Sequence, residues 1–204
     1  MLESLISISV ATLVLALSPG PDNIYVLSQS LVNGVKSGIA TTAGLISGCI
    51  VHTSLLAFGV SAVITASEEL FYGIKIAGAL YLIFLAFKVY RSSSEIDIAS
   101  KAPQKKYLEL FKTGVIMNLL NPKVMIFFLA FFPGFLWHPS ENTVLQFYIL
   151  GLTFMVVSFM VFSMVSILAG KISSYLLTHK KTGLYLKWLQ IAVFIGIAVF
   201  ILIP

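Results

Sequence analysis

Six long stretches of apolar residues, separated by short polar segments, account for most of the chain. An α-helix needs roughly 20 consecutive apolar residues to cross a bilayer, and each stretch is near or above that length. The stretches run at about 3–31, 38–66, 70–90, 108–136, 143–169 and 184–203. This pattern predicts an all-α integral membrane protein with six transmembrane helices, of which the first and the fourth are interrupted near their middles.

The composition indicates a chain that is solvated mostly by lipid. Of the 204 residues, 58% are hydrophobic and 10% are charged, whereas a soluble domain is about 45–50% apolar and about 25% charged. Six spans use nearly the whole length, so we expect a single transmembrane domain over 1–204. The N-terminal segment carries Glu3 and no Lys or Arg, so its apolar run is predicted to be a permanent span rather than a cleaved signal peptide.

Two further absences from the sequence narrow the chemistry. The single cysteine, Cys49, excludes an internal disulfide, a dithiol redox couple and any multi-cysteine metal site. The sequence has no glycine-rich nucleotide loop of the GxxxxGK[ST] type, so ATP-driven transport would require a separate subunit. We therefore expect no cofactor.

The basic residues are distributed unevenly between the two sides of the predicted bundle. The first, third and fifth connections, with the adjoining helix ends, hold Lys36, Lys88, Arg91, Lys101, Lys105, Lys106, Lys112, Lys171, Lys180, Lys181 and Lys187. The termini and the other two connections hold none, and Lys75 is the one basic residue close to that side. Because cytoplasmic connections are enriched in Lys and Arg, both termini are predicted outside and the central loop, 91–107, in the cytoplasm. The net charge of +5 is interpreted as topology, and no nucleic-acid partner is expected.

The central loop separates two halves, about 1–90 and about 108–204, that share one feature. In each half the first span is interrupted by a proline directly followed by a charged residue, within Ser18-Pro19-Gly20-Pro21-Asp22-Asn23 and Asn118-Leu119-Leu120-Asn121-Pro122-Lys123. Three spans are an odd number, so the second half enters the membrane in the opposite sense. The sequence thus predicts two inverted three-helix repeats, an arrangement in which secondary transporters bind substrate at the repeat interface.

The interruptions have a direct physical consequence for the backbone. Proline removes an amide donor, and Gly20 tolerates backbone angles outside the helix. Unpaired backbone groups at membrane depth persist only where protein or a water-filled cavity satisfies them. Pro21 and Pro122 suit the first position of a restarted half-helix, with Ser18, Asn118 and Asn121 as nearby caps. The start of such a half-helix attracts an anion.

Two charged residues lie at these restarts. Asp22 complements the positive end of its half-helix, whereas Lys123 opposes it. A charge near the bilayer centre costs about 2.5–3.5 kcal/mol on insertion scales, so both need a reason to be there. One interpretation is a structural Asp22–Lys123 ion pair that holds the halves together.

The alternative interpretation is a site for a zwitterion. Lys123 and the half-helix amides would bind a carboxylate, while Asp22 and freed carbonyls would bind an ammonium. The candidate substrate-binding residues are Pro19, Gly20, Pro21, Asp22, Asn23, Asn118, Asn121, Pro122 and Lys123. Asp22 is also a candidate for proton coupling, because it is acidic and predicted to be buried.

Two other features of the second span have alternative interpretations. His52, one turn beyond Gly48, is a candidate proton relay or a hydrogen-bonded packing residue. Gly44 and Gly48 form a small-xxx-small pair that lets another helix approach closely, either within the bundle or in a homodimer.

Several motifs extend the pattern beyond the interrupted spans. They are Ser18-Pro19-Gly20-Pro21, Gly34 to Gly48, Gly78-Ala79-Leu80-Tyr81-Leu82, Phe111-Lys112-Thr113-Gly114 through Asn118, Asn121-Pro122-Lys123, Phe127-Phe128 and Pro133-Gly134-Phe135. Over nearly the whole chain they resemble the LysE/RhtB family of bacterial amino-acid exporters. Gly134 departs from the family's pattern, which has a glutamine there, and this leaves the subfamily open. The resemblance implies an inner (plasma) membrane carrier that exports amino acids using the proton-motive force.

Other functions fit the residues less well. Metal export would favour clustered Asp, Glu, His or Cys within the membrane, but only Asp22 and His52 are present there, and Lys123 would repel a cation. An enzyme would need paired cysteines or a nucleophile with a base nearby, and the sequence offers neither pattern. A structural subunit would gain nothing from charges at broken helices. The partners we expect are an amino-acid substrate, protons and lipid.

Overall fold

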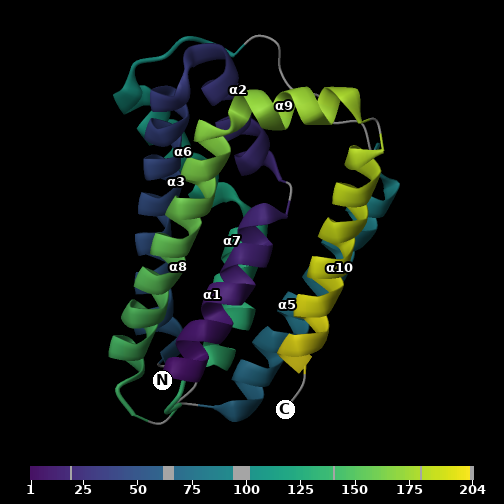
Figure 1. Ribbon diagram of the computed structural model, residues 1–204. Coiled ribbons are helices and arrows are strands. Elements are labelled where there is room, and N and C mark those ends of the chain that lie inside the picture. The colour runs from purple at the N-terminus through teal and green to yellow at the C-terminus, as the bar shows by residue number, and fades with distance from the viewer. Residues whose placement is uncertain (19, 62–66, 94–101, 140, 180, 203–204) are drawn as a thin grey trace.

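The computed structural model describes residues 1–18, 20–61, 67–93, 102–139, 141–179 and 181–202. All regular structure in these ranges is helical (Figure 1), which confirms the all-α prediction. The first half contains α1 (Leu2–Leu17), α2 (Pro21–Asn33), α3 (Val35–Leu55), the π-helical η1 (Leu56–Val60) and α5 (Glu68–Arg91). The second half contains α6 (Tyr107–Leu120), α7 (Pro122–Ile126), the π-helical η2 (Phe127–Phe131), the 3₁₀ turn η3 (Phe132–Phe135), α8 (Thr143–Ile167), α9 (Ala169–Thr178) and α10 (Thr182–Leu202).

The helices of membrane-spanning length agree with the predicted spans. Four are long and apolar enough to cross as single spans: Val35–Val60, Glu69–Arg91, Thr143–Ile167 and Thr182–Leu202. Two further spans are bent pairs, α1 with α2 at 64° and α6 with Pro122–Phe135 at 53°. With each pair counted as one span, the described residues contain six candidate membrane spans, and the predicted interruptions of the first and fourth spans are confirmed.

The two halves run through the bundle in opposite directions. Both termini lie at one end, here called the termini end, while α2, α9 and the start of α6 lie at the other, here called the loop end (Figure 1). α5 packs along α10 and α3 along α8, which pairs corresponding elements of the two halves. The packing of α1 on α8 likewise matches that of α6 on α3. These pairings are those expected of an inverted repeat.

The closest helix crossing in the fold joins α3 to α6 and depends on glycine. A Cβ added at Gly44 would collide with the backbone of Phe111, and one added at Gly114 would collide with the backbone of α3. Gly48 lies directly against the Asn118 side chain. The predicted small-xxx-small pair therefore packs within the bundle, and it brings Asn118 beside α3.

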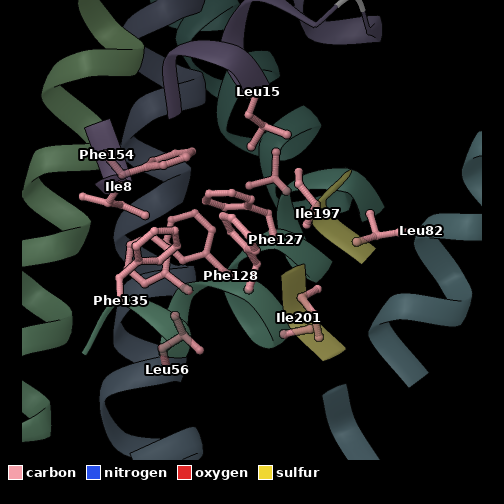
Figure 2. Packing of buried hydrophobic residues seen from close by; sticks show 14 of the residues in the cluster. Ile8, Leu15, Leu56, Leu82, Phe127, Phe128, Phe135, Phe154, Ile197 and Ile201 are labelled. Carbon is pink, nitrogen blue, oxygen red and sulfur yellow. The ribbon is translucent and has the colours of Figure 1, made fainter. Parts of the chain in front are cut away.

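The interior of the termini end is filled with aromatic rings. Figure 2 shows Phe127, Phe128, Phe135 and Phe154 packed together with Ile8. The ring centroids of Phe128 and Phe132 are 4.6 Å apart in a stacked arrangement. Consecutive aromatic residues of η2 and η3 supply most of these rings, so the second half-helix restarts directly into a dense apolar core.

One helix was not predicted. The sequence pattern extended the fifth span to residue 169, but α8 ends at Ile167 and α9 then crosses the loop end of the bundle (Figure 1). α9 contacts α2 as well as α8. It is too short to span a bilayer, and its polar residues Lys171, Ser173 and Ser174 gave its sequence the character of a connection.

Candidate functional site

The first break leaves carbonyl groups without helical partners at the end of α1. The Leu15 carbonyl would accept from the amide four residues later, but Pro19 has no amide hydrogen. In the structure Lys123 Nζ donates to Leu15 O and to Ser18 O, each at 3.0 Å. Asn23 Nδ2 donates to Ala16 O at 2.7 Å. The Lys123 ammonium thus lies at the negative end of α1, where a cation is favoured.

The second break has the same defect and a related solution. The Asn118 carbonyl lacks its usual donor because the fourth residue on is Pro122. His52 Nε2 lies 3.4 Å from Asn118 O, and the Asn121 amide donates to the same oxygen at 3.1 Å. In each break, a side chain from the opposite half therefore contacts a carbonyl that a proline leaves without its helical donor.

Asn121 connects the two breaks. Its Oδ1 accepts from the Lys123 amide at 3.0 Å and so caps α7. Its Nδ2 donates to Asp22 Oδ2 at 2.6 Å. Asp22 is only 7% exposed, and its other oxygen, Oδ1, is buried without a hydrogen-bond partner among the described residues.

The two charged side chains lie on either side of this amide. Within the described ranges they form no direct ion pair at 4.0 Å or less. Asp22 bonds to a side chain of the second half, and Lys123 bonds to backbone oxygens of the first half. The halves are therefore linked at the breaks by hydrogen bonds that the second half donates to the first.

A small cavity lies at this junction. It measures about 30 Å³ and is lined by Leu15, Ala16, Asp22, Asn23, Leu45, Ile46, Cys49, Asn118, Lys123, Val124, Phe154, Ser158 and Phe162. That volume holds about two water molecules. It is too small for an amino acid.

The structure brings most of the predicted site residues together. Asp22, Asn23, Asn118 and Lys123 line the cavity. Asn121 joins two of them, as described above. A Cβ added at Gly20 would lie 3.9 Å from Lys123 Nζ, so this glycine sits beside the ammonium.

The remaining predicted residues have other positions. Pro21 and Pro122 occupy the first positions of α2 and α7, where the sequence placed them. His52 is buried, does not line the cavity, and packs against the Phe128 ring at 5.5 Å between centroids. Pro19 lies outside the described residues.

Some lining residues were not predicted from the sequence. Ser158, Phe154 and Phe162 come from one face of α8, and Cys49 comes from α3. A single serine in an apolar helix is a weak indication, because serine there commonly bonds to its own backbone. Within the described part of the chain, no three His, Cys, Asp or Glu side chains are grouped so as to hold a metal ion.

Comparison with known proteins indicates a transporter. Residues 13–204 match the family model described as LysE type translocator. The homoserine/homoserine lactone efflux protein of Salmonella typhimurium is 34% identical over 162 residues, covering 79% of this chain and 78% of that protein. The protein of the same description from Salmonella typhi is also 34% identical over 162 residues. No solved structure matches the chain.

Proposed function

Because the chain belongs to the family of LysE type translocators, we propose that it is a secondary active transporter that exports amino acids or closely related metabolites from the cytoplasm and is driven by the proton-motive force. The observation that carries this proposal is the junction of the two breaks, where Asp22 and Lys123 line the same small cavity. The relatives named for homoserine efflux make homoserine and its neighbours the first substrates to test.

The hydrogen bonds at the two breaks suggest how a zwitterion would bind. A substrate carboxylate would take the Lys123 ammonium from Leu15 O and Ser18 O, and the substrate ammonium would take those oxygens in return. Asp22 would complete the ammonium site, since its Oδ1 has no partner among the described residues. Such an exchange leaves few buried polar groups unpaired, which limits its free-energy cost.

Asp22 is the proposed carrier of the coupling proton. Among the described residues, Asp22 is the one buried carboxylate. Protonation of Asp22 from outside would remove its charge and release the substrate ammonium. Loss of the proton to the cytoplasm would restore the site. His52, bonded to Asn118 O, is a second candidate on the proton path.

The proposed orientation places the loop end in the cytoplasm. The basic residues at the ends of α5, α6 and α10 support it, because cytoplasmic segments are enriched in Lys and Arg. The membrane is proposed to be the bacterial inner membrane. This orientation is tested by thiol labelling of Lys106→Cys, which should react in inverted vesicles and not in intact cells. Reaction in intact cells would show that the orientation is the opposite one.

The decisive experiment is efflux from cells preloaded with labelled amino acids, including homoserine. Wild type is compared with Asp22→Asn and Lys123→Met, and Lys112→Met serves as a matched control because Lys112 is exposed on α6. Both site variants should lose efflux on the order of tenfold or more, while Lys112→Met should keep the wild-type rate at equal expression. If both site variants kept the wild-type efflux rate, the substrate would not bind at the breaks.

Proton coupling is tested separately in inverted vesicles. An imposed pH gradient should drive wild-type uptake into the vesicles, and a protonophore should abolish it. Uptake that continues unchanged with the protonophore would contradict the coupling and leave the substrate assignment standing.

A further inference from the structure

α2 is attached to its neighbours through glycine at both ends. It is a helix of 13 residues with Gly20 as its N-cap and Gly34 as its C-cap. Gly34 has φ of 86°, a left-handed value that disfavours other residues, and nothing lies within 4 Å of the Cβ position there. The helix covers the loop end of the bundle and packs on α3, α8 and α9 (Figure 1). It can therefore change its angle at two points without breaking a continuous helix.

One face of α2 carries a stripe of polar residues, two of them buried and the third half-buried. Asp22, Gln29 and Asn33 are separated by seven and four residues, about two turns and one turn, so they lie on the same face of the helix. Gln29 is 0% exposed. Asn33 Nδ2 donates to Gln29 Oε1 at 2.8 Å, and it also lies 3.4 Å from Ala102 O and 3.3 Å from Pro103 O in the central connection. The stripe thus runs from the cavity to the surface of the loop end.

The packing of α2 leaves four of its polar atoms without a partner among the described residues. Asp22 Oδ1, Tyr25 OH, Ser28 Oγ and Gln29 Nε2 are all buried without a partner among the described residues. On the helices that α2 packs against, Thr42 Oγ1 of α3 and Ser163 Oγ of α8 share this state. Each such group costs about 1–3 kcal/mol. A helix with only a scaffold role would bury apolar side chains here instead.

The contact between α2 and α8 is close but is not held by hydrogen bonds between the two helices. A Cβ at Gly38 would collide with both Ser30 Oγ of α2 and Ser166 Oγ of α8, so these serines lie next to each other. Yet Ser30 Oγ donates to Val26 O at 2.7 Å, and Ser166 Oγ donates to Phe162 O at 3.0 Å, each within its own helix. Separation of α2 from α8 therefore breaks neither of these bonds.

From these observations we propose that the α2 stripe of Asp22, Gln29 and Asn33 is the route by which substrate passes between the loop end and the central site. The Gln29 carboxamide is a transit binding group for the polar groups of the substrate, and it becomes accessible when α2 separates from α8. The inference rests on the proposed transport function, and it adds a path and a moving element to it.

A reversible disulfide between α2 and α8 tests the movement. Ser30→Cys with Ser166→Cys, once oxidised, should lower efflux on the order of tenfold or more, and reduction should restore it. Each single variant under the same oxidant is the control and should keep its rate. Full efflux by the oxidised double variant, with cross-linking verified on gels, would overturn the inference. No efflux by wild type or by the reduced variant would instead count against the proposed function.

Labelling at Gln29 tests the route without any transport assay. Gln29→Cys should react with a small hydrophilic thiol reagent in membranes, and excess substrate should slow this reaction. The reaction should almost stop when the same protein also carries Ser30→Cys and Ser166→Cys, joined by an oxidised disulfide. Thr53→Cys is a matched control, because Thr53 is also 0% exposed but lies near the opposite end of α3. Equal labelling of the two positions, or labelling of Gln29→Cys that ignores the cross-link, would refute a route opened by α2.

Discussion

The two ends of the bundle are closed by different kinds of packing around the same central site. The loop end is closed by α2, whose buried face is polar and only partly hydrogen-bonded. The termini end is closed by a cluster of phenylalanine rings from η2, η3 and α8 (Figure 2). Water entering the loop end would reach several polar groups of α2 that lack partners among the described residues, whereas water entering the termini end would meet mostly apolar surface.

Two buried glutamines, one at each end, make the difference concrete. Gln146, 2% exposed, accepts from the amides of Trp137 and His138 and donates to the carbonyls of His138 and Glu141. Gln29, 0% exposed, has a partner for its oxygen only, and its Nε2 has none among the described residues. Gln146 is therefore held by hydrogen bonds at both ends of its carboxamide, whereas Gln29 is held only at its oxygen.

This difference predicts which end of the bundle opens at the lower free-energy cost. Exposing one buried phenylalanine to water costs about 1.5–3 kcal/mol, and several would be exposed together at the termini end. A neutral hydrogen bond contributes only about 0.5–1.5 kcal/mol net, and several polar groups at the loop end make none. Opening the loop end is therefore the less costly conformational change.

Removing one ring from the termini end should have the largest effect on stability. Phe132 is 0% exposed and stacks on Phe128, so Phe132→Ala should lower the free energy of unfolding by about 3–5 kcal/mol. Phe84→Ala is the control, because Phe84 is 54% exposed on α5. Unfolding in mixed micelles followed by tryptophan fluorescence measures both. Equal losses of unfolding free energy in the two variants would show that the aromatic cluster does not stabilise the termini end.

The same substitution should affect protein stability much more at Gln146 than at Gln29. Gln146→Leu leaves two amides and two carbonyls without their partner, so it should cost about 3 kcal/mol or more. Gln29→Leu breaks one bond but removes an unsatisfied amide, so stability should change by less than about 1 kcal/mol while efflux falls. Unfolding and efflux assays on both variants check this. Similar destabilisation in both would mean that the two ends are packed equally tightly.

The main features of the fold were predictable because they depend on local sequence. Apolar length sets the spans, and a proline in the interior of an apolar stretch interrupts the helix because it has no amide hydrogen and clashes with the preceding turn. Both breaks and both half-helix starts at Pro21 and Pro122 follow from this. The α9 helix was missed because a short, partly polar helix at a membrane surface has no such length requirement.

The arrangement at the site depended on contacts that local sequence does not determine. By sequence, Lys123 opposes the dipole of its own half-helix, and the structure shows that its long side chain reaches the carbonyl end of α1 instead. Likewise, Asn121 was expected to cap a helix, and it also donates to Asp22 from the other half. Which atoms meet across the repeat interface follows from the helix crossing angles, which hydropathy does not contain.

A smaller effect is expected where two adjacent threonines differ only in hydrogen bonding. Thr41 and Thr42 are both 0% exposed, but Thr41 Oγ1 donates to Ser37 O at 3.0 Å and Thr42 Oγ1 has no partner among the described residues. Valine has nearly the same shape as threonine. Thr41→Val should cost about 1 kcal/mol, whereas Thr42→Val should stabilise by about 1 kcal/mol. Thermal unfolding of both proteins decides this, and destabilisation by Thr42→Val would mean that its hydroxyl is satisfied.

The smallest effect is expected at Asn33, where α2 meets the central connection. Its contacts to Ala102 O and Pro103 O, at 3.4 and 3.3 Å, are long for hydrogen bonds, so Asn33→Ala should change global stability by less than about 0.5 kcal/mol. Limited proteolysis in the connection should nevertheless become faster, because the bond between this segment and α2 is lost. Lys187→Met, which removes the bond from Lys187 Nζ to Ser92 O at 2.7 Å, is the control at the other end of the connection. A large loss of stability in Asn33→Ala would show that this end of α2 is firmly anchored to the connection, which would count against the proposed separation of α2 from α8.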